Sequence, residues 1–170
     1  MIRKLALAAL AAGLVATPAL AAEKLKVETS KGCSFDISLR PDLAPKHVEQ
    51  ITKLAKEGFY DGIVFHRVIE GFMAQTGDPT GTGMGGSKLP DIKAEFSQEP
   101  FKRGTVGMAR SSDPDSGNSQ FFVMFAPGDF LNGQYTVWGQ VDESGMACVD
   151  QIARGEPPAN PDKMTKVTVE

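Results

Sequence analysis

Short segments of alternating apolar and polar residues run through most of this chain. Such a period of two places successive side chains on opposite faces of a β-strand. Residues 25–29 and 33–39 alternate on either side of Lys31-Gly32, which predicts a hairpin. Further strands are expected at residues 64–69, 72–75, 105–110, 120–125, 136–141 and 166–169. About eight short strands predict a mainly β protein, a single antiparallel sheet closed into an eight-stranded β-barrel, because closure removes free edges.

Two segments have the helical period instead. Within residues 44–57 apolar residues recur every three or four positions, Pro45 stands near the start, and Gly58 follows the end. A second, shorter helix is expected at about residues 146–153. These two α-helices would cap the open ends of the barrel. His47 is expected on the polar, solvated side of the first helix.

The first residues have the three parts of a secretory signal peptide. Arg3 and Lys4 give a basic start, an Ala/Leu/Val-rich run follows, and Ala19-Leu20-Ala21 is a small-residue cleavage site. The apolar run is too short to span a bilayer, which disfavours an uncleaved membrane anchor. We therefore expect residues 1–21 to be removed, leaving residues 22–170 as one exported domain without membrane attachment.

The charge of the mature chain argues against a nucleic-acid partner. Without Arg3 and Lys4, 16 basic residues stand against 21 acidic ones, a net charge of −5. An acidic surface repels phosphate backbones.

Cys33 and Cys148 are the only cysteines of the chain. An oxidising compartment would allow them to pair. Pairing depends on a tertiary approach that the sequence does not reveal, so a disulfide and two partly buried thiols both stay open.

Several kinds of chemistry have little support. His47 and His66 are the only histidines, and neither has a partner at metal-ligand spacing, so neither a metal nor a cofactor is expected. No serine lies in a Gly-x-Ser-x-Gly elbow, which disfavours a hydrolase. Residues 81–86 match Gly-x-Gly-x-x-Gly, but the helix that a dinucleotide site requires does not follow; a flexible loop is expected.

The stretch FHRVIEGFMAQTGD, residues 65–78, places an arginine and a glutamine in an otherwise apolar run. Alternation puts Glu70 on a different face from Arg67, so Arg67 is expected to have no acidic partner. That arrangement leaves a cation available for a ligand.

Residues 120–125, QFFVMF, show which side of the sheet carries a groove. If Phe121, Val123 and Phe125 fill the barrel, Gln120 and Phe122 face outward. An aromatic side chain beside an amide on an outer surface indicates a binding groove, although a single exposed aromatic is common.

Two gapped motifs strengthen this interpretation. One is Phe65-His66-Arg67-Val68-Ile69-x-Gly71-Phe72-Met73-x-Gln75-x-Gly77-Asp78. The other joins Gly107-Met108-Ala109-Arg110 to Gly117-Asn118-Ser119-Gln120-Phe121-Phe122. In this order they resemble the signature of cyclophilins, the peptidyl-prolyl cis-trans isomerases. The resemblance extends from the first hairpin to the final strand and implies an eight-stranded antiparallel barrel with two helices and a groove on its outer face.

The resemblance also implies the site. Arg67, Gln75 and His66 would be the catalytic residues. The substrate-binding residues would be Phe72, Met73, Ala109, Arg110, Gln120, Phe122, Phe130, Leu131 and Tyr135. The groove would hold a proline ring while Arg67 donates toward the prolyl nitrogen, so the partner of Arg67 would be the substrate.

The implied function is acceleration of X-Pro isomerisation in flexible or unfolded polypeptides, assisting the folding of exported proteins. The alternative is a proline-peptide-binding module or holdase chaperone with little turnover. The resemblance is to the bacterial type of cyclophilin, which also has phenylalanine at the position of Phe130. Together with the signal peptide, this favours the periplasm, with secretion as the other destination. We expect a monomer.

The sequence departs from the cyclophilin pattern at three groove positions. Phe130 stands where many eukaryotic members have tryptophan, and the missing indole N–H predicts weak binding of cyclosporin-type inhibitors. Tyr135 stands where histidine is frequent. Arg110 stands where asparagine is frequent, and its charge is expected to favour acidic residues near the proline.

Overall fold

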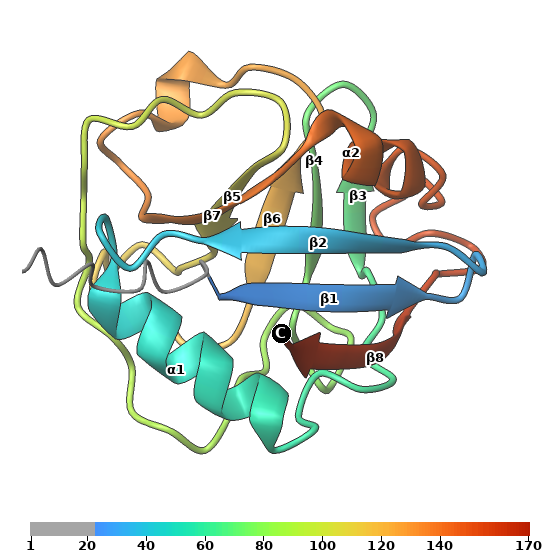
Figure 1. The fold of residues 1–170 in the computed structure, drawn as a ribbon, viewed down its shortest axis with the longest axis horizontal. Helices are drawn as coiled ribbons and strands as arrows, with labels where there is room; N and C mark the ends of the chain where they lie inside the picture. Colours follow the sequence, from blue (N-terminus) through green and yellow to red (C-terminus); the bar gives the residue numbers. More distant parts are fainter. Residues whose placement is uncertain (1–22) are drawn as a thin grey trace, which may run out of the picture.

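The computed structural model describes residues 23–170, which form one curled sheet with two α-helices and a short 3-10 helix (Figure 1). The predicted signal peptide, residues 1–21, lies outside the described residues. The elements, in chain order, are β1 (Lys24–Thr29), β2 (Ser34–Leu39), α1 (Pro45–Lys56), β3 (Arg67–Ile69), β4 (Met73–Thr76), β5 (Thr105–Met108), β6 (Phe121–Met124), η1 (Asp129–Leu131), β7 (Val137–Val141), α2 (Glu143–Val149) and β8 (Met164–Val169).

All neighbouring strands are antiparallel, in the order β3-β4-β6-β5-β7-β2-β1-β8. The prediction of a closed barrel is wrong, because no ladder joins the outer strands β3 and β8 within the described residues. We call the line where these two outer strands approach each other the seam. Isolated bridges join the chain across it, Val64 with Lys163 and Val68 with Gly155. The intervening chain carries Pro157, Pro158 and Pro161, whose missing N–H groups prevent a continuous ladder. The result is a curled half-barrel.

The two faces of β6 line two different apolar clusters, as its alternation predicts. Phe121 and Val123 belong to the main core, where Trp138 is fully buried and Phe121 meets its ring edge-on at 5.3 Å. Phe122 and Met124 belong to a smaller cluster on the other side of the sheet, with Met73, Phe101, Leu131 and Val137. This smaller cluster supports the groove described below.

Helix α1 matches its prediction, but His47 does not lie on a solvated face. Its side chain is 1% exposed, and Nδ1 lies 2.6 Å from Oε2 of Glu95. The Glu95 carboxylate also accepts the backbone N–H groups of Lys46 and His47. It thereby caps a helix whose own N-cap residue, Ala44, has no side-chain acceptor.

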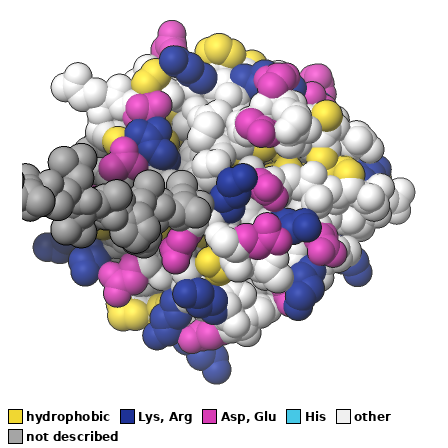
Figure 2. Space-filling view, in the orientation of Figure 1, with side chains coloured by type: hydrophobic (Ala, Val, Ile, Leu, Met, Phe, Trp, Pro, Cys, Tyr) yellow, Lys and Arg dark blue, Asp and Glu magenta, His cyan; other side chains and the backbone are white. Residues whose placement is uncertain are grey.

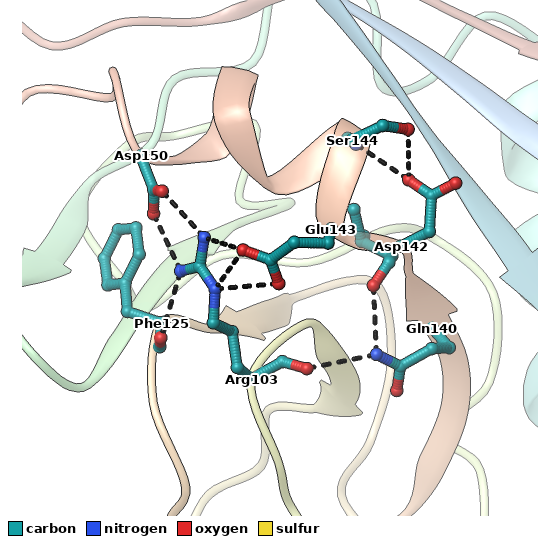
Figure 3. A network of polar contacts seen from close by, with 9 residues as sticks. Arg103, Phe125, Gln140, Asp142, Glu143, Ser144 and Asp150 are labelled. Carbon is teal, nitrogen blue, oxygen red and sulfur yellow. Dashed lines mark hydrogen bonds and ion pairs between the residues drawn. The ribbon is translucent and has the colours of Figure 1, made fainter.

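Helix α2 begins earlier than predicted, at Glu143 rather than near Met146, and ends at Val149. Asp142 supplies the start signal, since its carboxylate accepts from the Gly145 N–H at 2.7 Å. Figure 3 shows how the helix is held: the Arg103 guanidinium lies between Glu143 and Asp150, at 2.8 Å from each, and also donates to the Phe125 carbonyl.

Cys33 and Cys148 form a disulfide with a Cα–Cα distance of 5.8 Å. It joins the β1–β2 hairpin to α2, which packs on β2. Of the two possibilities that the sequence leaves open, the structure therefore has the disulfide.

Basic and acidic side chains intermix on the β1, β2 and β8 face (Figure 2). Lys24 pairs with Asp36 and Lys26 with Glu170, each at 3.8 Å. Among residues 23–170 no helix is long and apolar enough to cross a membrane.

Candidate active site

A groove of about 700 Å³ lies on the outer side of the sheet, over β3, β4 and β6. It brings together ten of the twelve predicted site residues, namely His66, Arg67, Phe72, Met73, Gln75, Ala109, Arg110, Phe122, Leu131 and Tyr135. The other two lie beside it. Gln120 lines an adjoining hollow of about 490 Å³, and Phe130 is 71% exposed with its ring 5.4 Å from that of Phe72.

The floor of the groove is apolar and tightly supported. Met73, Phe122 and Leu131 are each more than nine-tenths buried. Phe122 stacks on Phe101 at 5.8 Å and meets Tyr135 edge-on at the same distance. A floor fixed by aromatic contacts can receive a compact apolar ring without rearranging.

Glycine at position 107 allows this packing. A Cβ there would lie 2.5 Å from the Phe122 ring and 2.6 Å from the Phe101 ring. Any larger residue would displace the floor of the groove.

Strand register places the polar residues of the groove. Arg67 on β3 lies opposite Gln75 on β4, and Gln75 lies opposite Phe122 on β6. The three side chains therefore share one face of the sheet. A guanidinium and an amide thus stand next to the apolar floor.

Gln120 reaches the adjoining loop rather than the groove. Its amide accepts from Gln75 at 3.0 Å and donates to the carbonyls of Gly83 and Gly85. Gln120 therefore links Gln75 to the loop that follows β4.

Arg67 has an acidic partner, so the expectation of a partnerless arginine is wrong. Its Nε lies 3.0 Å from Oε1 of Glu156, which also lines the groove. Glu156 is 89 residues away in the sequence, and strand alternation describes only near neighbours. Glu70 does not pair with Arg67, as the strand alternation predicts; it pairs with Arg154 instead.

His66 is a buried, unpaired imidazole at the edge of the groove. It is 6% exposed, and neither ring nitrogen has a hydrogen-bond partner within residues 23–170. Burial lowers the pKa of His66, although the nearby Asp78 charge opposes this effect. Both ring nitrogens are themselves buried, so the ring packs at the edge of the groove rather than offering a free donor to it.

A buried carboxylate holds the glycine-rich loop that forms one wall of the groove. Asp78 accepts the backbone N–H groups of Thr80, Thr82, Gly83 and Gly85 and the Thr80 hydroxyl. Burial alone would raise the pKa of Asp78, but these hydrogen bonds outweigh it and lower the pKa to about 2. The backbone amides of the Gly-x-Gly-x-x-Gly stretch are thus occupied by the protein's own anion.

Arg110 is held against the wall. Its guanidinium lies 4.4 Å from the centre of the Tyr135 ring and donates to the carbonyls of Gln134 and Ser111. The Arg110 side chain lines both the groove and the adjoining hollow.

Sequence reasoning missed Asp78, Glu156, Pro157 and the wall residues Gly81, Thr82 and Gly83. The Asp-x-Thr spacing at Asp78 is a local signal for a side chain that bonds its own loop. Glu156 and Pro157 have no local signal, because only the seam of the sheet brings them to β3. Among residues 23–170 no three potential ligands are placed to hold a metal ion.

A groove with an apolar floor beside a guanidinium and an amide is the kind of site that can hold a peptide segment with a compact apolar ring. Comparison with known protein families identifies the reaction that this site catalyses. The model of the cyclophilin type peptidyl-prolyl cis-trans isomerase/CLD family matches residues 24–169. The chain belongs to this family and is a peptidyl-prolyl cis-trans isomerase.

Individual relatives agree. A Brucella suis protein named "Probable peptidyl-prolyl cis-trans isomerase" is 53% identical over 182 aligned positions, covering 97% of this chain and 92% of the relative. A "Peptidyl-prolyl cis-trans isomerase-like 1" of Aspergillus fumigatus is 41% identical, covering 74% of this chain and 78% of its own.

Solved structures show the same fold. The crystal structure of a cyclophilin from Hirschia baltica is 31% identical with a TM-score of 0.77, covering 85% of this chain and 73% of its own. A Cryptosporidium parvum cyclophilin crystallised in the presence of the dipeptide Ala-Pro is 26% identical with a TM-score of 0.79, covering 86% of this chain and 98% of its own.

Proposed function

We propose that the groove binds proline-containing segments of flexible polypeptides and that Arg67 stabilises the twisted X-Pro bond. Rotation about this bond breaks amide resonance and crosses a barrier of roughly 18–20 kcal/mol. No bond is cleaved, so the enzyme has only to favour the twisted state over both planar states.

The proposed roles follow the geometry. Phe72, Met73, Phe122 and Leu131 hold the proline ring and fix one side of the bond. Arg67 donates to the prolyl nitrogen, whose lone pair becomes available only when resonance is lost, and this contact lowers the barrier.

Gln75 contacts the peptide flanking the proline. His66 has a supporting role at the edge of the groove, and the main chain near Ala109 and Arg110 contacts the substrate backbone. Phe130 and Tyr135 border the proline site.

The observation that carries this proposal is the cross-strand pairing of Arg67 with Gln75 beside the apolar floor. The Ala-Pro dipeptide present with the Cryptosporidium parvum cyclophilin supports a proline peptide as ligand.

Exchange NMR on a short Ala-Pro-containing peptide tests the proposal, because it reports isomerisation and binding together. We expect Arg67→Ala to lower the catalysed exchange rate by about 100-fold, the effect of removing one donor aimed at the transition state. Peptide-induced shifts should persist, since the floor remains. Arg40→Ala removes another partly exposed, ion-paired arginine and serves as the control.

The competing function predicts a different result. A binding module or holdase would show peptide shifts without accelerated exchange in the wild type. An Arg67→Ala variant that keeps the wild-type exchange rate would contradict the role of Arg67.

The proposed biological role is to assist the folding of exported proteins, with the periplasm as compartment. The signal-like residues 1–21 support export, and the Cys33–Cys148 disulfide suits an oxidising compartment. Fractionation of cells that express the full chain tests this, and recovery of the uncleaved chain in the cytoplasm would contradict it.

Two further expectations stay predictions. Cyclosporin-type inhibitors should bind weakly and gain affinity in Phe130→Trp, measured by inhibition of exchange.

The protein should be a monomer, which light scattering can measure.

A further inference from the structure

A bridge at the seam of the sheet places Glu156 beside Arg67. Val68 and Gly155 exchange both backbone hydrogen bonds at 2.8 Å as an antiparallel bridge. Residues 67 and 156 are therefore neighbours across this bridge. The sheet thus presents the Glu156 carboxylate to the guanidinium.

The segment that carries Gly155 and Glu156 is fixed by contacts of the neighbouring Arg154. Arg154 pairs with Glu70, its guanidinium lies 4.2 Å from the centre of the Phe125 ring, and it donates to the carbonyls of Asp150 and Ile152. Glu156 is therefore carried by an anchored segment rather than by a free loop.

The ion pair uses one donor of Arg67 and leaves the others available. Glu156 accepts from Nε at 3.0 Å, and within residues 23–170 neither Nη atom has a hydrogen-bond partner. A guanidinium carries five N–H donors in a rigid planar fork. Holding the Nε edge restricts the plane of the fork and leaves the four Nη donors for a ligand in the groove.

We propose that Glu156 is a positioning residue that orients Arg67 for the twisted X-Pro bond. This inference rests on the proposed role of Arg67. A long arginine side chain otherwise samples many rotamers, and a donor that is already oriented needs no reorganisation when the prolyl lone pair forms. Glu156 therefore raises the rate of the rotation step more than it raises ground-state affinity.

The test compares Glu156→Ala, Glu156→Gln, Arg67→Ala and the Arg67→Ala/Glu156→Ala double variant by exchange NMR on the Ala-Pro peptide. We expect Glu156→Ala to lower the catalysed rate at saturating peptide about three- to tenfold, the range for a partly exposed charged contact. The Kd from peptide shifts should change less than about twofold. Glu156→Gln should recover most of the rate, because its amide oxygen can still accept from Nε.

The double variant shows whether Glu156 acts through Arg67. Adding Glu156→Ala to Arg67→Ala should cause no further loss. Glu49→Ala breaks an exposed ion pair on α1, away from the groove and from the segment that carries Glu156, and should keep the wild-type rate.

Each remaining outcome decides against the inference. A wild-type rate in Glu156→Ala, an equal loss in Glu49→Ala, a Gln variant as slow as the Ala variant, or a further loss in the double variant would each overturn it. If Arg67→Ala itself keeps the wild-type rate, the proposed role of Arg67 is wrong; if only Glu156→Ala does, the error is confined to Glu156.

Discussion

At the scale of single residues, the groove depends on charged side chains whose partners are fixed by the fold. Arg67 faces Glu156, Arg110 lies on Tyr135, and Asp78 is surrounded by the N–H groups of its own loop. Arg67 and Arg110 both line the groove. Asp78 acts on the wall, since its loop lines both the groove and the adjoining hollow.

Asp78 gives a prediction for acid stability. Its folded-state pKa of about 2 lies below the ordinary value of 3.8, so its contribution is present above the ordinary value and lost as pH falls from about 4 to 2. The shift corresponds to about 2 kcal/mol of unfolding free energy. Asp78→Asn should therefore lose about this amount at pH 7, and the difference from wild type should shrink toward pH 2.

Urea denaturation across this pH range measures the effect. Asp113→Asn is the control, because Asp113 is exposed and its carboxylate accepts one hydrogen bond, from the backbone N–H of Asp115. A constant difference between Asp78→Asn and the wild type from pH 7 to pH 2 would show that the carboxylate charge is not responsible.

At the scale of elements, helix α1 receives its cap from elsewhere in the chain. Glu95 bonds the N–H groups of Lys46 and His47 and the His47 ring. Burial alone would raise the pKa of Glu95, but the hydrogen bonds from His47 and Lys46 outweigh it and lower that pKa. Burial lowers the pKa of His47, against the opposing effect of Glu95.

This contact predicts that Glu95→Ala lowers the unfolding free energy by about 1–2 kcal/mol at neutral pH, the usual effect of losing a helix cap. Chemical denaturation followed by circular dichroism measures it. Glu49→Ala, on the exposed side of the same helix, is the control and should change stability by less than about 0.5 kcal/mol. Equal effects of the two substitutions would mean that Glu95 is not the cap.

At the scale of the whole molecule, the seam bridges and the disulfide connect residues that are far apart in the sequence. The seam between β3 and β8 is bridged through residues 155 and 163. The Cys33–Cys148 disulfide joins residues separated by 115 positions. A cross-link over a long loop reduces the conformational freedom of the unfolded chain.

Reduction of the disulfide should therefore lower the unfolding free energy by about 2–4 kcal/mol. Denaturation midpoints with and without reductant measure the change. The Cys33→Ser/Cys148→Ser double variant should match the reduced wild type and show no response to reductant. An unchanged midpoint, with thiol labelling proving complete reduction, would contradict this contribution.

The sequence by itself determined which segments become strands, where α1 lies, which face of β6 fills the core, and ten of the residues that line the groove. These features follow from local periodicity and from motifs whose residues are close in the chain. The predicted start of α2 is too late, because the cap at Asp142 starts the helix at Glu143.

Only the tertiary structure decided the rest: the open seam, the disulfide, the burial of His47 against Glu95 and the pairing of Arg67 with Glu156. Each of these depends on two segments that are distant in the chain and meet only when the sheet curls. Local periodicity fixes the direction of a side chain relative to its own element, whereas its partner is fixed by the packing of other elements around it.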